Sequence, residues 1–120
     1  MKLACIAAGL LGMAACSHSR LAPRAVEPPD SEEREDARAS EKRSAALQQE
    51  LLALTAGQAT PECHRVCELI EQICDLSQRI CLIAGRHRDD AELADRCTAG
   101  EQRCHRSRDR APAGCLCQAR

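Results

Sequence analysis

Two stretches of equal length decide the fold, CDLSQRIC from Cys74 to Cys81 and CTAGEQRC from Cys97 to Cys104. In each stretch the cysteines stand seven residues apart, close to two turns of an α-helix, so both lie on one helix face. Residues at equal height in two antiparallel helices have numbers with a constant sum. Cys81 and Cys97 add to 178, and so do Cys74 and Cys104. The spacing therefore predicts a helical hairpin closed by the disulfides Cys81–Cys97 and Cys74–Cys104.

The same register extends to the C-terminal tail. Cys63 and Cys115 also add to 178, which leaves Cys67 to pair with Cys117. A bend in the tail would favour Cys63–Cys117 with Cys67–Cys115, and the sequence leaves both pairings open. Gly100 lies between the two cysteines of its helix and lets the helices come close, as disulfides need Cα atoms within about 4.4–6.8 Å.

Hydrophobic periodicity predicts three helices, at about 41–56, 61–85 and 90–108. The second has an aliphatic stripe beside its cysteine face, formed by Val66, Leu69, Ile73, Leu76 and Ile80. This stripe suits a leucine face on the first helix, and the cysteine face suits the third helix. No alternating strand pattern occurs in the sequence. We expect an all-α domain at residues 45–120, a disulfide-stapled antiparallel helical hairpin with a third packing helix.

Helix boundaries follow from glycine, proline and capping residues. Gly57 is expected to stop the first helix and Gly85 the second. Thr60 is expected to cap the second helix, with Pro61 at its first position. Asp89 is expected to cap the third, with Glu92 three residues later as in a capping box.

Composition makes the cysteines structurally important. The 120 residues include ten cysteines and no aromatic residue. A core of Leu, Ile and Val in a domain of about 75 residues is marginal, and disulfides compensate for it. The formal net charge of -1 excludes nucleic-acid binding by the overall field.

The N-terminus is typical of a signal peptide. In MKLACIAAGLLGMAAC, Lys2 precedes an apolar and small run at residues 3–15 that is too short to span a bilayer of about 30 Å. The ending MAAC resembles the lipobox of bacterial lipoproteins, with Met13 in place of the usual Leu. The resemblance implies that residues 1–15 are removed and that Cys16 is lipidated. Ordinary secretory cleavage, with Cys16 as one more thiol, is the alternative.

The lipoprotein resemblance also implies a location. Lipidated Cys16 would anchor the protein to a membrane of the bacterial cell envelope, the lipid being its only non-protein group. Ser17 stands where the family's inner-membrane retention signal is Asp, which favours the outer membrane. The other cysteines of the mature chain are even in number and face an oxidising compartment.

Residues 17–44 are rich in charge and proline and poor in large apolar side chains. Such a segment buries too little apolar surface to offset its chain entropy. We expect residues 16–44 to form the lipidated cysteine and a disordered tether, with transient helix after Asp30. A recognition segment that folds on a partner is the alternative.

The predicted domain resembles disulfide-bridged helical hairpins over residues 61–117, such as the coiled-coil–helix–coiled-coil–helix proteins and the α-hairpinins. Their paired cysteines are separated by steps of ten residues, and the step here is seven. The resemblance therefore concerns architecture and implies no function.

Metal binding is the main alternative to the disulfides. Cys63, His64 and Cys67 are close in CHRVC, and His105 follows Cys104. Thiolates and imidazoles in a helical bundle bind Cu(I) or Zn(II). The register, however, already assigns each of these cysteines to a disulfide, so we expect no metal cofactor.

Two further observations bear on function. The sequence has no Cys-x-x-Cys motif at a helix start and no specific Ser/His/Asp arrangement, so we expect no enzyme. The last helix ends in a basic group made of Arg103, His105, Arg106, Arg108 and Arg110. Such residues interact favourably with the helix dipole, and they could also contact anionic lipid or glycan. The sequence thus predicts a small lipid-anchored envelope protein of structural or binding type, with an envelope protein or glycan as partner.

Overall fold

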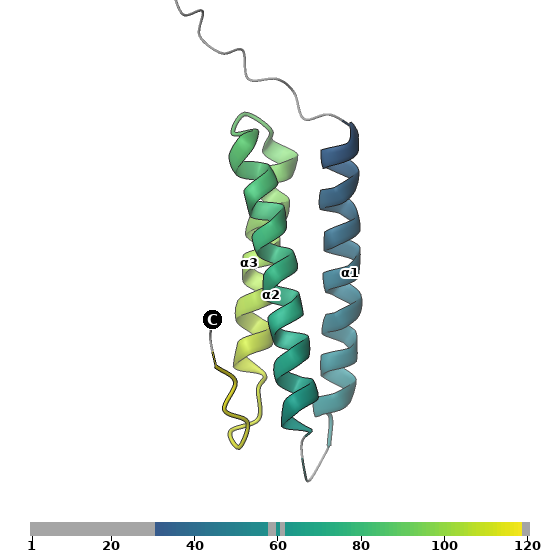
Figure 1. Ribbon diagram of the computed structural model, residues 1–120, viewed down its shortest axis with the longest axis vertical. Coiled ribbons are helices and arrows are strands. Elements are labelled where there is room, and N and C mark those ends of the chain that lie inside the picture. The colour runs from purple at the N-terminus through teal and green to yellow at the C-terminus, as the bar shows by residue number, and fades with distance from the viewer. Residues whose placement is uncertain (1–30, 58–59, 61, 119–120) are drawn as a thin grey trace, which may run out of the picture.

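The computed structural model describes residues 31–57, 60 and 62–118 as a bundle of three helices (Figure 1). These are α1 (Ser31–Thr55), α2 (Cys63–Arg86) and α3 (Ala91–Asp109). Figure 1 shows α2 and α3 as an antiparallel hairpin, with α1 packed along α2 and the C-terminal tail folding back beside the hairpin. The described residues contain no strand. The predicted all-α hairpin with a third packing helix is confirmed.

Helix α1 corrects the expected boundary of the tether. It begins at Ser31, so residues 31–44 are helical and not part of a tether. Ala37, Ser40 and Ser44 of this segment are buried against the hairpin. Its charged side chains pair with α2 and α3, which a reading of local composition alone does not reveal. The remainder of the expected tether, residues 16–30, lies outside the described residues.

The ends of α2 also differ from expectation. The helix begins at Cys63 with Glu62 as N-cap, later than the predicted cap at Thr60. Pro61 lies outside the described residues. The helix ends at Arg86, one residue beyond Gly85, and His87 is its C-cap.

Helix α3 begins one residue later than predicted, because Asp90 and not Asp89 is its N-cap. The Asp90 carboxylate accepts a hydrogen bond of 3.0 Å from the backbone N–H of Leu93. Glu92 therefore lies one position too early for a capping box, and its carboxylate pairs with arginines instead. The predicted stop of α1 holds, since the helix ends at Thr55 and Gly57 has a positive φ of 71°.

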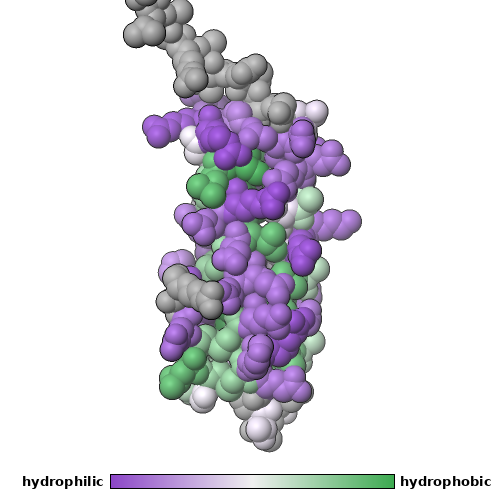
Figure 2. Space-filling view, viewed as in Figure 1, coloured by the Kyte–Doolittle hydropathy of each residue, from purple (hydrophilic) through white to green (hydrophobic). Residues whose placement is uncertain are grey.

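Two apolar clusters fill the space between α1 and the hairpin. The larger contains Leu51, Val66, Leu69, Ile70 and Ile73, and the smaller contains Ala37, Ile83 and Leu93. The aliphatic stripe of α2 thus faces α1, as its position on the helix predicts. Figure 2 shows hydrophilic side chains over much of the face in view, with hydrophobic residues exposed between them.

Four disulfides close the hairpin and hold the tail. Their pairs are Cys81–Cys97, Cys74–Cys104, Cys63–Cys115 and Cys67–Cys117, with Cα–Cα distances of 4.6, 4.7, 5.1 and 5.2 Å. Three of these pairs have the common register, Cys67–Cys117 is the pair that remains, and the tail takes the first of the two alternatives. Gly100 is buried between the two hairpin disulfides and lies against Ser77 of α2.

Candidate functional site

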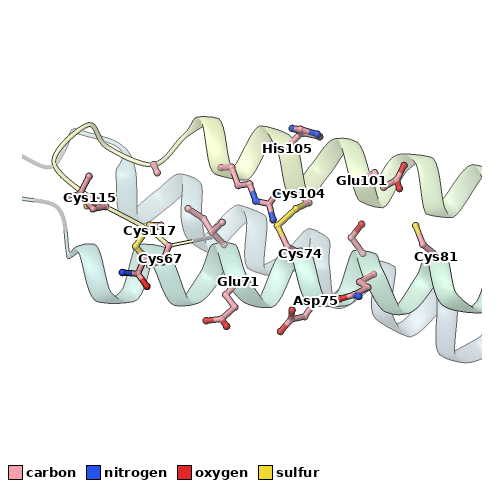
Figure 3. Close-up of a pocket in the computed structure, with 17 residues that line it drawn as sticks. Cys67, Glu71, Cys74, Asp75, Cys81, Glu101, Cys104, His105, Cys115 and Cys117 are labelled. Atoms are coloured by element: carbon pink, nitrogen blue, oxygen red, sulfur yellow. A yellow bond between two sulfur atoms is a disulfide. The ribbon is translucent and has the colours of Figure 1, made fainter. Parts of the chain in front are cut away.

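The candidate site is a groove of about 980 Å³ between α2, α3 and the C-terminal tail (Figure 3). Its lining residues run from Cys67 to Cys81 on α2 and from Glu101 to Gln118 on α3 and the tail. No described residue of α1 lines it, and Figure 3 shows α1 behind the hairpin. The groove therefore occupies the side of the hairpin that α1 leaves open.

Disulfide sulfurs follow the length of the groove, because the cysteine stripe of α2 faces this side. Cys74–Cys104 and Cys67–Cys117 cross it, and Cys81 lines its far end. These bonds join α2 to α3 and to the tail at successive heights. They hold the walls at a set separation, so the groove is preformed.

The tail presents one leucine to solvent. Leu116 is 92% exposed, yet its neighbours Cys115 and Cys117 are both bonded to α2. The backbone N–H of Cys115 also donates a hydrogen bond of 2.8 Å to the carbonyl of Pro112. Leu116 is therefore held on an anchored backbone at the edge of the groove.

Charged side chains flank the groove on both helices. Glu71 and Asp75 come from α2, and Glu101, His105 and Arg108 come from α3. Asp75 and Glu101 are exposed and have no hydrogen bond or ion pair with a described residue. Carboxylates outnumber guanidinium groups here by three to one.

The opposite side of the hairpin has a different electrostatic pattern, because most of its carboxylates are paired with arginine or histidine, Glu32 and Glu35 being exceptions among the described residues. Six residues of α1 form ion pairs with the hairpin, and five of them lie in its N-terminal half. We call these five the α1 ion-pair network: Glu33, Arg34, Asp36, Arg38 and Glu41. Hydrogen bonds from His87 and then Arg86 lower the pKa of Glu33 below its ordinary value of 4.5. Further down, Arg65 bonds Glu50 and Glu68, and this pairing raises its pKa.

The basic end of α3 is less uniform than the sequence indicates. His105, Arg106, Arg108 and Arg110 are exposed. Arg103 is half-buried, and its Nε and one terminal nitrogen are fully enclosed with no hydrogen-bond partner among the described residues. Burial, and secondarily the charge of Arg106, lowers its pKa. Arg103 therefore belongs to the helix interface and not to an open basic surface.

The structure does not bring together the alternative metal ligands. Cys63, Cys67 and Cys104 are each bonded to another cysteine, and His64 and His105 are exposed. Within the described part of the chain, one group of His, Cys, Asp or Glu has ligand atoms close enough to share a metal ion.

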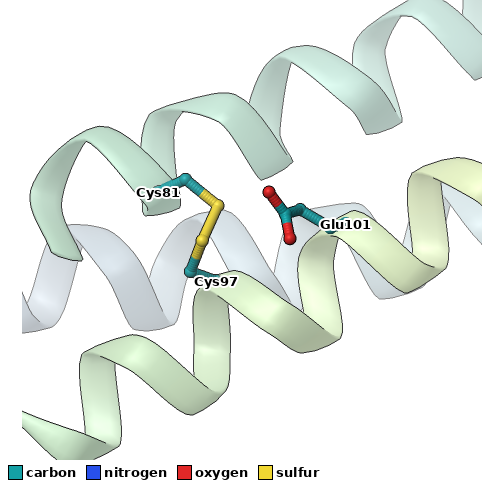
Figure 4. A group of neighbouring side chains, drawn as sticks. All are labelled: Cys81, Cys97 and Glu101. Atoms are coloured by element: carbon teal, nitrogen blue, oxygen red, sulfur yellow. A yellow bond between two sulfur atoms is a disulfide. The ribbon is translucent and has the colours of Figure 1, made fainter. Parts of the chain in front are cut away.

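That group is Cys81, Cys97 and Glu101, whose ligand atoms lie within 4.8 Å of one another (Figure 4). The two sulfurs are bonded to each other, and a disulfide sulfur is not the thiolate that binds metal. The sequence hypothesis missed Glu101. Its position four residues after Cys97, on the same helix face, was the available signal.

Cys16, the predicted lipidation site, lies outside the described residues. Across residues 31–57, 60 and 62–118, no helix combines the length and hydropathy that a bilayer span requires. The sequence matches no protein-family model, and comparisons with curated proteins and with solved structures also give no match.

Proposed function

We propose that this chain is a small lipid-anchored protein of the bacterial cell envelope, with a binding or structural role and no catalytic activity. One observation carries the proposal. All eight cysteines from Cys63 to Cys117 are used in disulfides, whereas Cys16 stands apart, directly after the lipobox-like MAA. The cysteines thus divide into a structural set and a single N-terminal residue suited to lipid.

The disulfides support an envelope location. Disulfides of this kind persist in oxidising compartments such as the periplasm and the cell surface. The only other cysteine, Cys5, lies in the apolar segment that signal cleavage would remove. Ser17 after the lipidated position favours the outer membrane, as it does in the sequence alone.

A binding or structural role agrees with the kinds of side chain that the domain presents. The groove has disulfides, carboxylates and an exposed leucine, and the described residues include no free thiol that could act as a nucleophile. We therefore propose that the domain holds an envelope protein or glycan at the membrane surface.

The test is membrane fractionation of Cys16→Ser in a bacterial host. We expect loss of lipid labelling and either release from membranes or accumulation of the unprocessed chain. Cys5→Ser is the matched control, since it removes a cysteine from the same segment and should leave processing unchanged. Membrane retention and lipid labelling of Cys16→Ser like those of the wild type would refute the anchor.

A copper- or zinc-binding lipoprotein is the second candidate, favoured by the closeness of Cys81, Cys97 and Glu101. In a reduced form these residues would supply two thiolates and a carboxylate, which are ligands for Zn²⁺. Counting free thiols and bound metal on protein purified from the native envelope separates the candidates. No free thiols and no metal supports the disulfide scaffold, and reduced cysteines with bound copper or zinc supports the metal protein.

A further inference from the structure

We propose that the groove between α2, α3 and the tail is a docking site for a basic amphipathic helix of a partner protein. The proposal gives the binding role above a site and a partner chemistry. It rests on that binding role but not on the lipid anchor. The docking proposal and the lipid anchor can therefore be refuted separately.

The first argument is the exposure of Leu116. Among the described residues, the exposed large hydrophobic side chains are Leu82 and Leu116, and only Leu116 lines the groove. Disulfides on both sides of Leu116 restrict its backbone, so burying its side chain against a partner costs little ordering entropy. An apolar side chain on a preorganised backbone has the properties of an interface anchor.

The second argument is the contrast in charge pairing between the two sides of the hairpin. On the α1 side, arginines of the chain itself neutralise the carboxylates Glu33, Asp36 and Glu41. On the groove side, Asp75 and Glu101 have no cationic partner among the described residues. Complementary charge would therefore come from lysine or arginine side chains of another molecule.

The shape of the site favours a helix over other peptide conformations. Two antiparallel helices form the walls, and an amphipathic helix is the element that packs into a groove of this kind. The lining on α2 extends from Cys67 to Cys81, about 21 Å at the rise of an α-helix. A partner helix of about 14 residues matches that length.

The experiment uses the oxidised protein, labelled with ¹⁵N, and two synthetic helical peptides of 14 residues. One peptide has leucines on one face and lysines on the other, and the second has glutamate at each lysine position. We expect the lysine peptide to shift amide resonances of Cys67–Cys81 and of residues 101–118. The glutamate peptide should leave them unchanged.

Two variants and their matched controls test the named residues. We expect Asp75→Asn with Glu101→Gln to weaken lysine-peptide binding about tenfold, and Leu116→Ser to weaken it about tenfold or more. Glu32→Gln with Glu35→Gln removes two exposed carboxylates of α1 that have no ion pair with a described residue, and Leu82→Ser removes the exposed leucine outside the groove. These control variants should bind like the wild type.

Several results would overturn the proposal. One is the absence of any amide resonance shift with the lysine peptide, and another is a set of shifts centred on α1. A third is an equal loss of peptide affinity in the variants and in their controls. Shifts of the groove resonances with phosphatidylglycerol vesicles, in the absence of any shift with the peptide, would assign the surface to lipid instead. None of these results bears on the membrane fractionation of Cys16→Ser.

Discussion

At the scale of single residues, Gly100 shows how closely the hairpin is packed. A Cβ atom at this position would lie 3.1 Å from Ser77 Oγ and 3.3 Å from Ser77 Cα. The backbone of Ser77 has little freedom to move away, because disulfides at Cys74 and Cys81 join that segment of α2 to α3. The close approach of the helices therefore depends on a residue without a side chain.

We predict that Gly100→Ala lowers the free energy of unfolding by about 1 kcal/mol. Overpacking lowers the free energy of unfolding by about 1–3 kcal/mol, and the better helix propensity of alanine raises it by about 1 kcal/mol. Gly100→Leu should destabilise the protein more. Thermal unfolding followed by circular dichroism at 222 nm measures both effects.

The matched control is Gly85→Ala, also within a helix, where a Cβ atom would meet nothing within 4 Å. The free energy of unfolding of that variant should rise by about 0.5–1 kcal/mol, because alanine has a better helix propensity than glycine. Ser77→Gly combined with Gly100→Ala should recover part of the loss. Equal stabilisation by alanine at Gly85 and Gly100 would contradict the packing argument.

At the scale of elements, α1 differs from the other two helices because no disulfide joins it to them. Its C-terminal half packs through Leu47, Leu51 and Leu54. Its N-terminal half buries mainly Ala37, Ser40 and Ser44 and depends on the α1 ion-pair network. The first half of α1 is therefore held largely by ion pairs, and the second by apolar packing together with the ion pair between Glu50 and Arg65.

We predict that acid loosens the N-terminal half of α1 first. The pKa of Glu33 is lower in the folded state than its ordinary value of 4.5. Its contribution to stability is therefore present at neutral pH and is lost as the pH falls through the folded-state value. Glu33→Gln should lower the thermal midpoint by a few degrees at pH 7, and the difference from wild type should vanish in strong acid.

Hydrogen exchange at neutral pH locates the effect. Residues 31–44 should exchange faster in Glu33→Gln than in the wild type, while α2 and α3 stay protected. Glu35→Gln is the control, because Glu35 is exposed and has no ion pair with a described residue. A Glu33→Gln deficit that is independent of pH would show that the carboxylate charge does not stabilise the helix.

At the scale of the whole molecule, covalent bonds compensate for a small core. The domain has no aromatic residue, and its fully buried large side chains are a few aliphatic ones such as Leu51, Leu69, Ile73, Ile80 and Leu93. Each disulfide contributes about 2–4 kcal/mol, mainly by restricting the unfolded chain. Four such contributions are comparable to the net stability of a whole small protein, about 5–15 kcal/mol.

We predict that full reduction unfolds the domain or severely loosens it at room temperature. The helical circular dichroism signal should fall, and amide resonances should collapse to the narrow range of an unfolded chain. As a control, the thiols are blocked after reduction. Blocked thiols cannot exchange disulfides, so any remaining loss of structure reports unfolding. An unchanged thermal midpoint in strong reductant would show that the aliphatic core is sufficient by itself.

The sequence predicts much of this fold because its strongest signals are periodic. Spacing of seven between Cys74 and Cys81, repeated at Cys97 and Cys104, defines a helix face, a direction and a register together. The same arithmetic extends to Cys63 and the tail, although it leaves two pairings of the tail open. For the candidate site, the sequence provides the cysteines but neither the groove nor the exposure of Leu116.

Cysteine spacing and helical periodicity by themselves thus determined the hairpin, its register and the aliphatic face of α2. Only the tertiary structure decided that α1 begins at Ser31, that the tail pairs as Cys63–Cys115 and Cys67–Cys117, and that Leu116 borders an acidic groove. The reason is physical. Helical periodicity is a local property, whereas ion pairs such as Arg96–Glu41 join residues more than fifty positions apart and exist only after the helices have packed.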